Sequence, residues 1–293
     1  MSDFLLTRRR HRPSRVGLSV LGVLTGLLLL VGAARAAGTT APAGGEDSES
    51  ALAKQTQNPV ANLISVPFQN NLSFGAGSKD NKDNVVWVLN VQPVIPFHIG
   101  EHWNLITRTI IPIINQPSLF PQAENVFGMG DINPTVFLSP ADPGKLIWGV
   151  GPTMTFPTGT DQHLTSGKYS AGPAAVGLFM DGPWVVGALA NQQWSFAGWG
   201  EGDVNAFLIQ PFLNYNLPRG WYLSSAPIIT ANWSAPSGQH WTVPVGGGGG
   251  KLWRVGKVGL PVNTQVQAFY NLEKPDFGAD WQLRLQVQFL FPK

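Results

Sequence analysis

The sequence predicts an all-β fold, a transmembrane antiparallel β-barrel of about twelve strands, with roughly ten to fourteen as the permitted range. Three observations predict it: strands with one apolar and one amide-rich face, connectors that alternate between long and short, and a composition poor in charge. Only 12% of the 293 residues are charged, whereas 11 are Trp and 16 are Phe. So small a share of charged residues is unusual for a surface in water and typical of a surface in contact with lipid.

The last candidate strand, residues 281–291, displays the alternation most clearly. Successive side chains of a strand point to opposite faces, so odd and even positions form two separate walls. One wall is apolar and aromatic, and the other holds Gln282, Arg284, Gln286 and Gln288. A soluble protein commonly has Lys and Glu on its water-facing wall. Amides opposite an apolar wall are instead typical of an outer-membrane barrel, which is polar inside and apolar outside.

Residues 1–36 have the features of a cleaved signal peptide. Five arginines precede an uncharged, mostly apolar run over 16–34, and Ala34-Arg35-Ala36 provides a small-residue cleavage site. An uncleaved inner-membrane anchor is the alternative, because the run is just long enough to span a bilayer. Six of the 19 basic and one of the 17 acidic residues lie here, so the remainder carries a net charge of −3. That charge gives no reason to expect nucleic acid as a partner.

Residues 37–64 are predicted to be a flexible periplasmic leader, since 38–57 are rich in Gly, Ala, Ser and acidic residues without an apolar period. A short helix fits only within 52–64, ending near Asn58-Pro59. The barrel is expected over 65–293, where β-branched and aromatic residues are abundant. Its candidate strands are 65–74, 85–97, 103–113, 130–139, 145–156, 168–180, 184–194, 204–216, 221–233, 241–253, 258–271 and 281–291.

The connectors between the candidate strands alternate in length. Those at 75–84, 114–129 and 157–167 are long, whereas those at 98–102, 140–144 and 181–183 are short. Outer-membrane barrels have long extracellular loops and short periplasmic turns, and a soluble β-sandwich has no reason to alternate in this way. An even strand number also places both ends of the barrel on the periplasmic side.

Prolines inside the candidate strands each remove one ladder hydrogen bond and are expected to mark a bulge or kink. Such gaps either open lateral routes between lumen and lipid for apolar solutes or only shape the barrel wall. The number of prolines favours the second interpretation. The residues are Pro93, Pro96, Pro112, Pro134, Pro152, Pro211, Pro227, Pro244 and Pro261.

Several short strings along the chain are distinctive as a set. They are Gln57-Asn58-Pro59, Pro67-Phe68-Gln69-Asn70-Asn71, Gln92-Pro93-Val94-Ile95-Pro96-Phe97, Trp103-Asn104-Leu105-Ile106-Thr107-Arg108, Gly130-Asp131-Ile132, Gly149-Val150-Gly151-Pro152, Gly172-Pro173-Ala174-Ala175, Asn191-Gln192-Gln193-Trp194-Ser195, Gln210-Pro211-Phe212 and Phe289-Leu290-Phe291-Pro292-Lys293. Together they resemble a family of bacterial outer-membrane β-barrel transporters, which is related to the barrels of the MetA-pathway of phenol degradation. The resemblance covers about residues 52–293. It implies a barrel and the passage of small organic molecules, and it brings no catalytic or binding residues.

The inward-pointing side chains, assigned strand by strand, are mostly amides. The strands at 168–180 and 184–194 are ambiguous, because Ala, Gly and Val occur on both faces. A lining of neutral hydrogen-bonding groups suits a channel or facilitator for small, uncharged or weakly polar organic solutes, aromatic ones included. The candidate lumen-lining residues are Asn90, Gln92, Asn104, Arg108, Asp131, Asn133, Gln210, Asn263, Gln265, Gln267, Arg284, Gln286 and Gln288.

Arg108, Arg284 and Asp131 are the clearest charges of this lumen and allow two interpretations. In the first, the arginines give an open channel a mild preference for anions. In the second, which is slightly favoured, the three form ion pairs that brace a filled interior, because buried charges need partners. Strand number leaves both open: about eight strands give a filled interior, and roughly 16–18 give an aqueous channel.

A closed barrel that binds a partner through its extracellular loops, or that stabilises the envelope, is the alternative to a channel. The connector at 114–129 bears on this choice, since folded inward it constricts a pore and standing outward it favours recognition. The expected partners are outer-membrane lipids and small organic solutes, and the oligomeric state is left open.

Enzymatic chemistry is not expected, and a lipid-acting barrel hydrolase is the least favoured function. His163 lies near Asp161 in sequence, but no serine, histidine and acid share a recognisable triad spacing. No cofactor or metal site is expected, because His98, Glu101 and His102 fit a solvated turn better than a cation site. The chain has no cysteine, which excludes disulfides and thiolate ligands.

Overall fold

The computed structural model describes residues 44–78, 84–119, 123–256 and 259–291. The predicted signal peptide at 1–36 lies outside the described residues, as does the first part of the predicted leader. Among the residues described, no helix has both the length and the apolar character needed to cross a bilayer.

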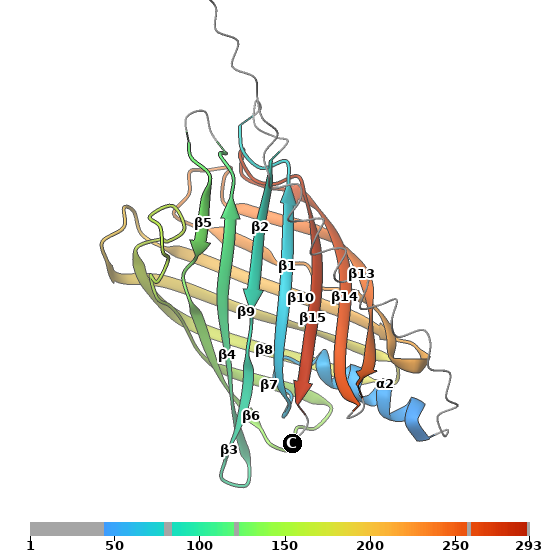
Figure 1. The fold of residues 1–293 in the computed structure, drawn as a ribbon. Helices are drawn as coiled ribbons and strands as arrows, with labels where there is room; N and C mark the ends of the chain where they lie inside the picture. The colour runs from blue at the N-terminus through green and yellow to red at the C-terminus, as the bar shows by residue number, and fades with distance from the viewer. Residues whose placement is uncertain (1–43, 79–83, 120–122, 257–258, 292–293) are drawn as a thin grey trace, which may run out of the picture. The chain divides into compact units, whose positions relative to one another are not determined.

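The described chain forms one closed antiparallel barrel with twelve strand positions (Figure 1). Closure is shown by the pairing of β9 with β10 and of β1 with β15. Three positions are shared by two shorter strands each, namely β2 with β3, β5 with β6 and β11 with β12. The strands are β1 Ile64–Phe74, β2 Val85–Val91, β3 Val94–Ile99, β4 Trp103–Gln116, β5 Val126–Met129, β6 Asn133–Pro140, β7 Leu146–Thr155, β8 Lys168–Asp181, β9 Trp184–Gly198, β10 Asn205–Asn216, β11 Trp221–Ser225, β12 Ile229–Asn232, β13 Trp241–Val255, β14 Leu260–Glu273 and β15 Trp281–Phe291. The predicted fold class and strand number are confirmed.

Some of the predicted proline irregularities are present. Pro93 separates β2 from β3, Pro227 separates β11 from β12, and the β13–β14 register shifts between Val243 and Pro244. Pro96, Pro112, Pro134, Pro152, Pro211 and Pro261 instead lie within paired strand segments. The ladder is nevertheless interrupted beside the facing pair Pro152–Pro173, because neither the β6–β7 nor the β8–β9 pairing is continuous there.

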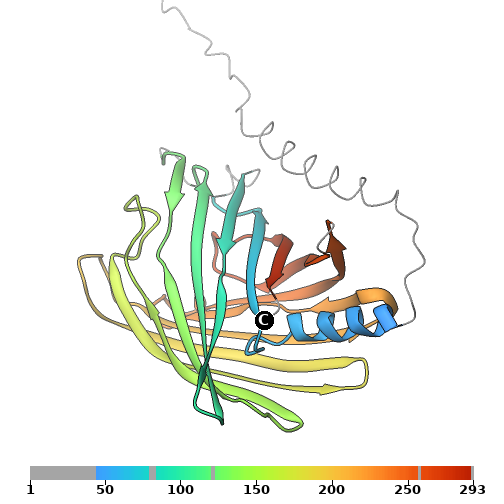
Figure 2. The ribbon, with the colours of Figure 1, turned by 60° about the horizontal axis from the view of Figure 1, so that its bottom comes forward.

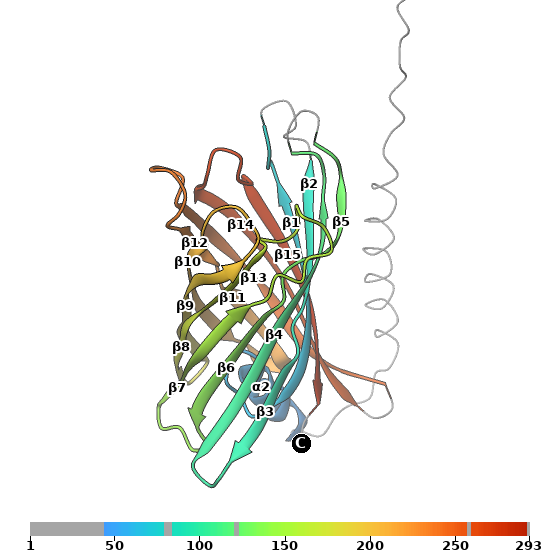
Figure 3. The same cartoon turned by 90° about the vertical axis from the view of Figure 1, so that its left-hand side faces the viewer.

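The predicted alternation of connector length is confirmed. The connectors 75–84, 117–125, 156–167, 199–204, 233–240 and 274–280 are at one end of the barrel, called here the long-loop end. The connectors 100–102, 141–145, 182–183, 217–220 and 256–259 are at the other, the short-turn end. Ile64 pairs with Phe291, so the first and last strands meet with their outer ends at the short-turn end (Figure 3).

The outer face of the barrel is apolar and aromatic. Exposed Phe97, Phe179, Leu213, Leu223 and Val266 lie between the two ends. Tryptophans gather near strand ends, and several touch another ring. Trp103 packs edge-on against Trp148, and Trp281 stacks on Phe74 with ring centroids 4.0 Å apart. These are the features of lipid-facing barrel walls with interfacial aromatic belts.

The inner face carries an apolar cluster besides the predicted amides, and the two are concentrated on different sides of the barrel. The side formed by β13, β14, β15 and β1 carries buried amides such as Asn71, Asn263 and Gln267. The opposite side carries a buried apolar cluster, to which the two ambiguous strands contribute Ala and branched residues and β6 and β10 contribute Phe137 and Phe212. That cluster comprises Val60, Ile106, Phe137, Ala174, Val176, Leu178, Val185, Leu189 and Phe212.

Within the predicted leader, a helix, α2 Gly44–Thr56, forms at the short-turn end (Figure 2), and it begins before the stretch 52–64 where a short helix was expected. It contacts η3 Pro218–Gly220 and β13, and Ala53 packs in a second cluster with Leu63, Leu252 and Leu290. The helix has only a small apolar face, so its stability comes from these contacts rather than from its own periodicity. The sequence pattern therefore gave little sign of it.

Candidate functional site: the barrel interior

The interior of the described barrel holds a cavity towards each end and a third one, of about 340 Å³, lined by Asn71, Asn90 and Arg284 among others. The long-loop chamber has a volume of about 610 Å³ and is lined from Asp131, Asn133 and Thr155 down to Gln69 and Arg108. The short-turn chamber is smaller, about 170 Å³, and is lined by Gln265, Gln286 and Gln288. Gln57 and Asn58 also line it, and they belong to residues 44–63, called here the N-terminal segment. The chambers share Gln69, Gln92, Arg108, Leu189 and Gln210, so these five residues surround the place where they meet.

The N-terminal segment is held inside the short-turn end by specific contacts. Gln57 and Asn216 exchange amide hydrogen bonds of 2.9 and 3.1 Å. Val60 is 4% exposed and belongs to the inner apolar cluster. The segment therefore narrows the lumen from within, which the sequence did not predict.

The structure places the predicted lumen-lining residues on the inner face, with two kinds of environment. Asn90, Gln92, Arg108, Asp131, Asn133, Gln210, Asn263, Gln265, Arg284, Gln286 and Gln288 line a cavity of the interior. Asn104 and Gln267 are buried in packed regions instead. Gln267 donates hydrogen bonds to the Ser224 hydroxyl and carbonyl, whereas the Asn104 Oδ1 atom has no partner.

Arg284 uses most of its N–H donors on neighbouring residues. Its guanidinium donates to Asn71 Oδ1 at 3.3 Å, Ala226 O at 2.8 Å, Gln267 Oε1 at 3.3 Å and Gln282 Oε1 at 3.5 Å. The Cζ atom also lies 4.7 Å from the centre of the Phe269 ring. Arg284 thus links four strand positions around the amide side of the lumen.

Arg108 differs sharply in its contacts, although it points into the same lumen. Among the residues that the structure describes, its one hydrogen bond runs from Nη2 to Gln92 Oε1 at 2.6 Å. A guanidinium has five N–H donors, so most of the donors of Arg108 face cavity rather than protein. It is also one of the few residues that line both chambers.

The prediction of ion pairs between Asp131 and the two arginines is wrong. Asp131 accepts hydrogen bonds from Gly159 N, Ser166 N and Ser166 Oγ, and so anchors the connector 156–167. Arg108 pairs in register with Thr135, four residues deeper along the wall, which is about 13 Å at the rise of a strand. Within the described residues, neither arginine has a carboxylate within ion-pairing distance.

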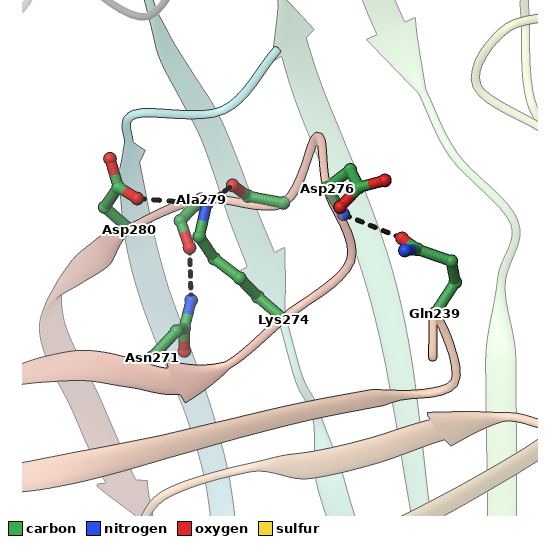
Figure 4. A network of polar contacts seen from close by, with 7 residues as sticks. Gln239, Asn271, Lys274, Asp276, Ala279 and Asp280 are labelled. Carbon is green, nitrogen blue, oxygen red and sulfur yellow. Dashed lines mark hydrogen bonds and ion pairs between the residues drawn. The ribbon is translucent and has the colours of Figure 1, made fainter. Parts of the chain in front are cut away.

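The connectors of the long-loop end are tied together rather than free (Figure 4). Lys274 forms an ion pair of 3.0 Å with Asp280, and Gln239 accepts a hydrogen bond from the backbone N–H of Asp276. The described part of the connector at 114–129 extends the wall as β5 paired with β4, with Phe127 68% exposed. No described residue of that connector lines the long-loop chamber, so this part stands outward.

The histidines of the described chain do not assemble an acid–base site. Backbone and side-chain hydrogen bonds from His163 hold the pKa of Asp161 below its ordinary value. Ser166, the nearby serine, bonds to Asp131 and not to His163. No cluster of three or more potential metal ligands was found among the residues that the structure describes.

Several lining residues escaped the sequence analysis. Phe137 and Leu189 face the long-loop chamber because their strands turn apolar residues inward. Gln55, Gln57 and Asn58 lie outside the barrel strands, yet they repeat the amide composition of the lumen wall. That shared composition, in a segment without any strand pattern, is the signal by which sequence reasoning could have found them.

No family model matches the chain, and no curated protein matches it. Its fold is similar to that of the COG4313 outer membrane channel from Pseudomonas putida F1, with a TM-score of 0.61 and 16% identity over 78% of this chain and 94% of that one. CdiB from Acinetobacter baumannii is more distant, with a TM-score of 0.37 and 11% identity over 79% of this chain and 60% of that one. The first likeness supports the barrel fold, and the resemblance to transporter barrels has no support from sequence matches.

Proposed function

We propose that the protein is an outer-membrane channel or facilitator for the passive passage of small, uncharged or weakly polar organic solutes, including aromatic ones. The observation that carries the proposal is the pair of chambers inside a closed barrel, which share five lining residues where they meet. Their mixed apolar and amide lining offers a weakly polar solute both contact area and hydrogen bonds.

The barrel lies in the bacterial outer membrane, with its apolar face against lipid and its long connectors outside the cell. Residues 1–36 act as a cleaved signal peptide. The likeness to a protein described as an outer membrane channel supports this arrangement.

Single-channel recording of the refolded mature protein in a planar bilayer tests the proposal. We expect small, discrete conductance steps that benzyl alcohol, a neutral aromatic solute, partly blocks. The folded state is verified beforehand by its heat-modifiable migration on a gel. A folded barrel that never conducts, and whose liposomes take up benzyl alcohol no faster than protein-free liposomes, contradicts the proposal.

A closed barrel that binds a partner through its long connectors is the second candidate. Two observations favour it: the N-terminal segment lines the small short-turn chamber, and the connectors are joined by a polar network (Figure 4). This candidate predicts a folded barrel that does not conduct and whose long-loop end is ordered.

A further inference from the structure

The long-loop chamber is amphipathic in a specific way. Its lining combines the apolar side chains of Phe137, Leu189, Leu208 and Ile228 with Arg108 and several amides. Arg108 and Phe137 come from the neighbouring strands β4 and β6. A volume of about 610 Å³ falls within the range of roughly 300–1,000 Å³ typical of small-molecule sites. The chamber is therefore large enough for a compound of one ring with a polar substituent.

Arg108 has fewer hydrogen-bond acceptors around it than a guanidinium can use, and no described carboxylate balances its charge. Among the described residues it uses one donor, on Gln92. Arg284 already donates to four acceptors, so it cannot supply the same binding capacity.

We propose that Arg108 is the anion-binding residue of a site for small aromatic or short-chain carboxylates in the long-loop chamber. The planar guanidinium fork matches the two oxygens of a carboxylate, while the ring or chain packs on Phe137 and Leu189. The site adds singly charged organic acids to the neutral solutes proposed above. That these acids pass through the barrel rests on the proposed function, whereas their binding in the chamber does not.

The charge arrangement selects this class of ligand over others. One available guanidinium matches one carboxylate, whereas a phosphate dianion would need further donors that Arg284 has already committed. A cationic solute would meet the positive charge of Arg108, which no described carboxylate compensates. A carboxylate without an apolar body would leave the wall formed by Phe137 and Leu189 unused.

Isothermal titration calorimetry on the detergent-folded mature protein tests the site, with benzoate, benzyl alcohol and acetate as probes. Benzoate is expected to bind at least about tenfold more tightly than benzyl alcohol, which lacks the charge, and than acetate, which lacks the ring. Arg108→Gln is expected to weaken benzoate binding by about ten- to a hundredfold, while binding of benzyl alcohol stays the same. Arg108→Lys should lie between, because it keeps the charge without the fork.

Arg254→Gln is the matched control, since it removes the same charge from an exposed position paired with Glu49. It should leave benzoate binding unchanged. Equal affinity of the wild-type protein for benzoate and benzyl alcohol would overturn the proposal, and this comparison needs no variant to fold. An Arg108→Gln protein that folds and keeps full benzoate affinity would also overturn it.

Calorimetry separates this site from the proposed function. Benzoate binding that depends on Arg108, in a barrel that passes no solute, would support the site and refute passage. Passage of benzyl alcohol without selective benzoate binding would refute the site and leave the channel standing.

Discussion

At the scale of single residues, two arginines with the same inward orientation in the sequence have different roles in the structure. Arg284 is bonded on several sides, whereas Arg108 has one bond and faces open cavity. The two interpretations of the lumen charges, bracing and selectivity, therefore apply to different residues. Strand alternation identifies which face a side chain takes, but the acceptors around it come from strands distant in sequence.

Arg284→Gln is predicted to destabilise the barrel by on the order of 3 kcal/mol, because several buried acceptors lose a charged donor. Urea unfolding in detergent micelles, followed by gel mobility, measures the loss. The exposed Arg254→Gln should change stability by less than about 1 kcal/mol. Equal stability of the two variants would show that Arg284 braces nothing.

Asp131 illustrates what strand alternation cannot predict. Alternation places its side chain on the inner face, in agreement with the structure, but its hydrogen-bond partners are main-chain and hydroxyl donors of a loop. A face assignment says nothing about height along the barrel. Height decides which charges meet.

At the scale of elements, the strands and connector lengths were predictable because alternation and turn residues are local signals. The helix α2 and the segment after it were not, since their order depends on contacts such as Ala53 with Leu252 and Gln57 with Asn216. Tertiary packing, and not propensity, fixes this part of the chain.

Val60→Asp is predicted to release the N-terminal segment from the lumen and to raise conductance. An unpaired carboxylate in the apolar cluster costs on the order of 3 kcal/mol, which raises the released population about a hundredfold. Single-channel recording measures the change. Ala51→Asp places the same side chain on the exposed side of α2 and should leave conductance unaltered.

Gly172→Ala is predicted to destabilise the wall by about 1–3 kcal/mol. A Cβ atom at Gly172 would collide with the Gln192 carbonyl, beside the interrupted β8–β9 ladder. Gly177→Ala, on the same strand, meets nothing and should be nearly neutral. Urea unfolding of both variants compares them directly, and a neutral Gly172→Ala would mean that the wall relaxes freely at this point.

At the scale of the whole molecule, the closed barrel was predictable from composition, alternation and connector parity together. The two-sided interior was not, because an apolar residue facing a lumen looks the same in sequence as one facing lipid. Phe137 and Phe179 show the difficulty, since the first is fully buried and the second is 56% exposed.

The orientation of the barrel in the membrane gives a further prediction. The chain has no cysteine, so a single introduced cysteine is the only thiol to react. Gln162→Cys, in a long connector, should react with a membrane-impermeant maleimide on intact cells. Asp142→Cys, in a short turn, should react only after the outer membrane is permeabilised. Labelling with the reverse preference would invert the proposed orientation.

The pairing of β1 with β15 joins residues from opposite ends of the described chain, from Ile64 with Phe291 to Phe74 with Trp281. The seam cannot form until the final strand has been synthesised and delivered to the membrane. Until then, both neighbouring edges present unpaired backbone groups that lipid cannot satisfy. Barrel assembly is consequently an all-or-nothing event timed by the C-terminal strand, and a chain that stops short of it should be cleared by proteases rather than inserted.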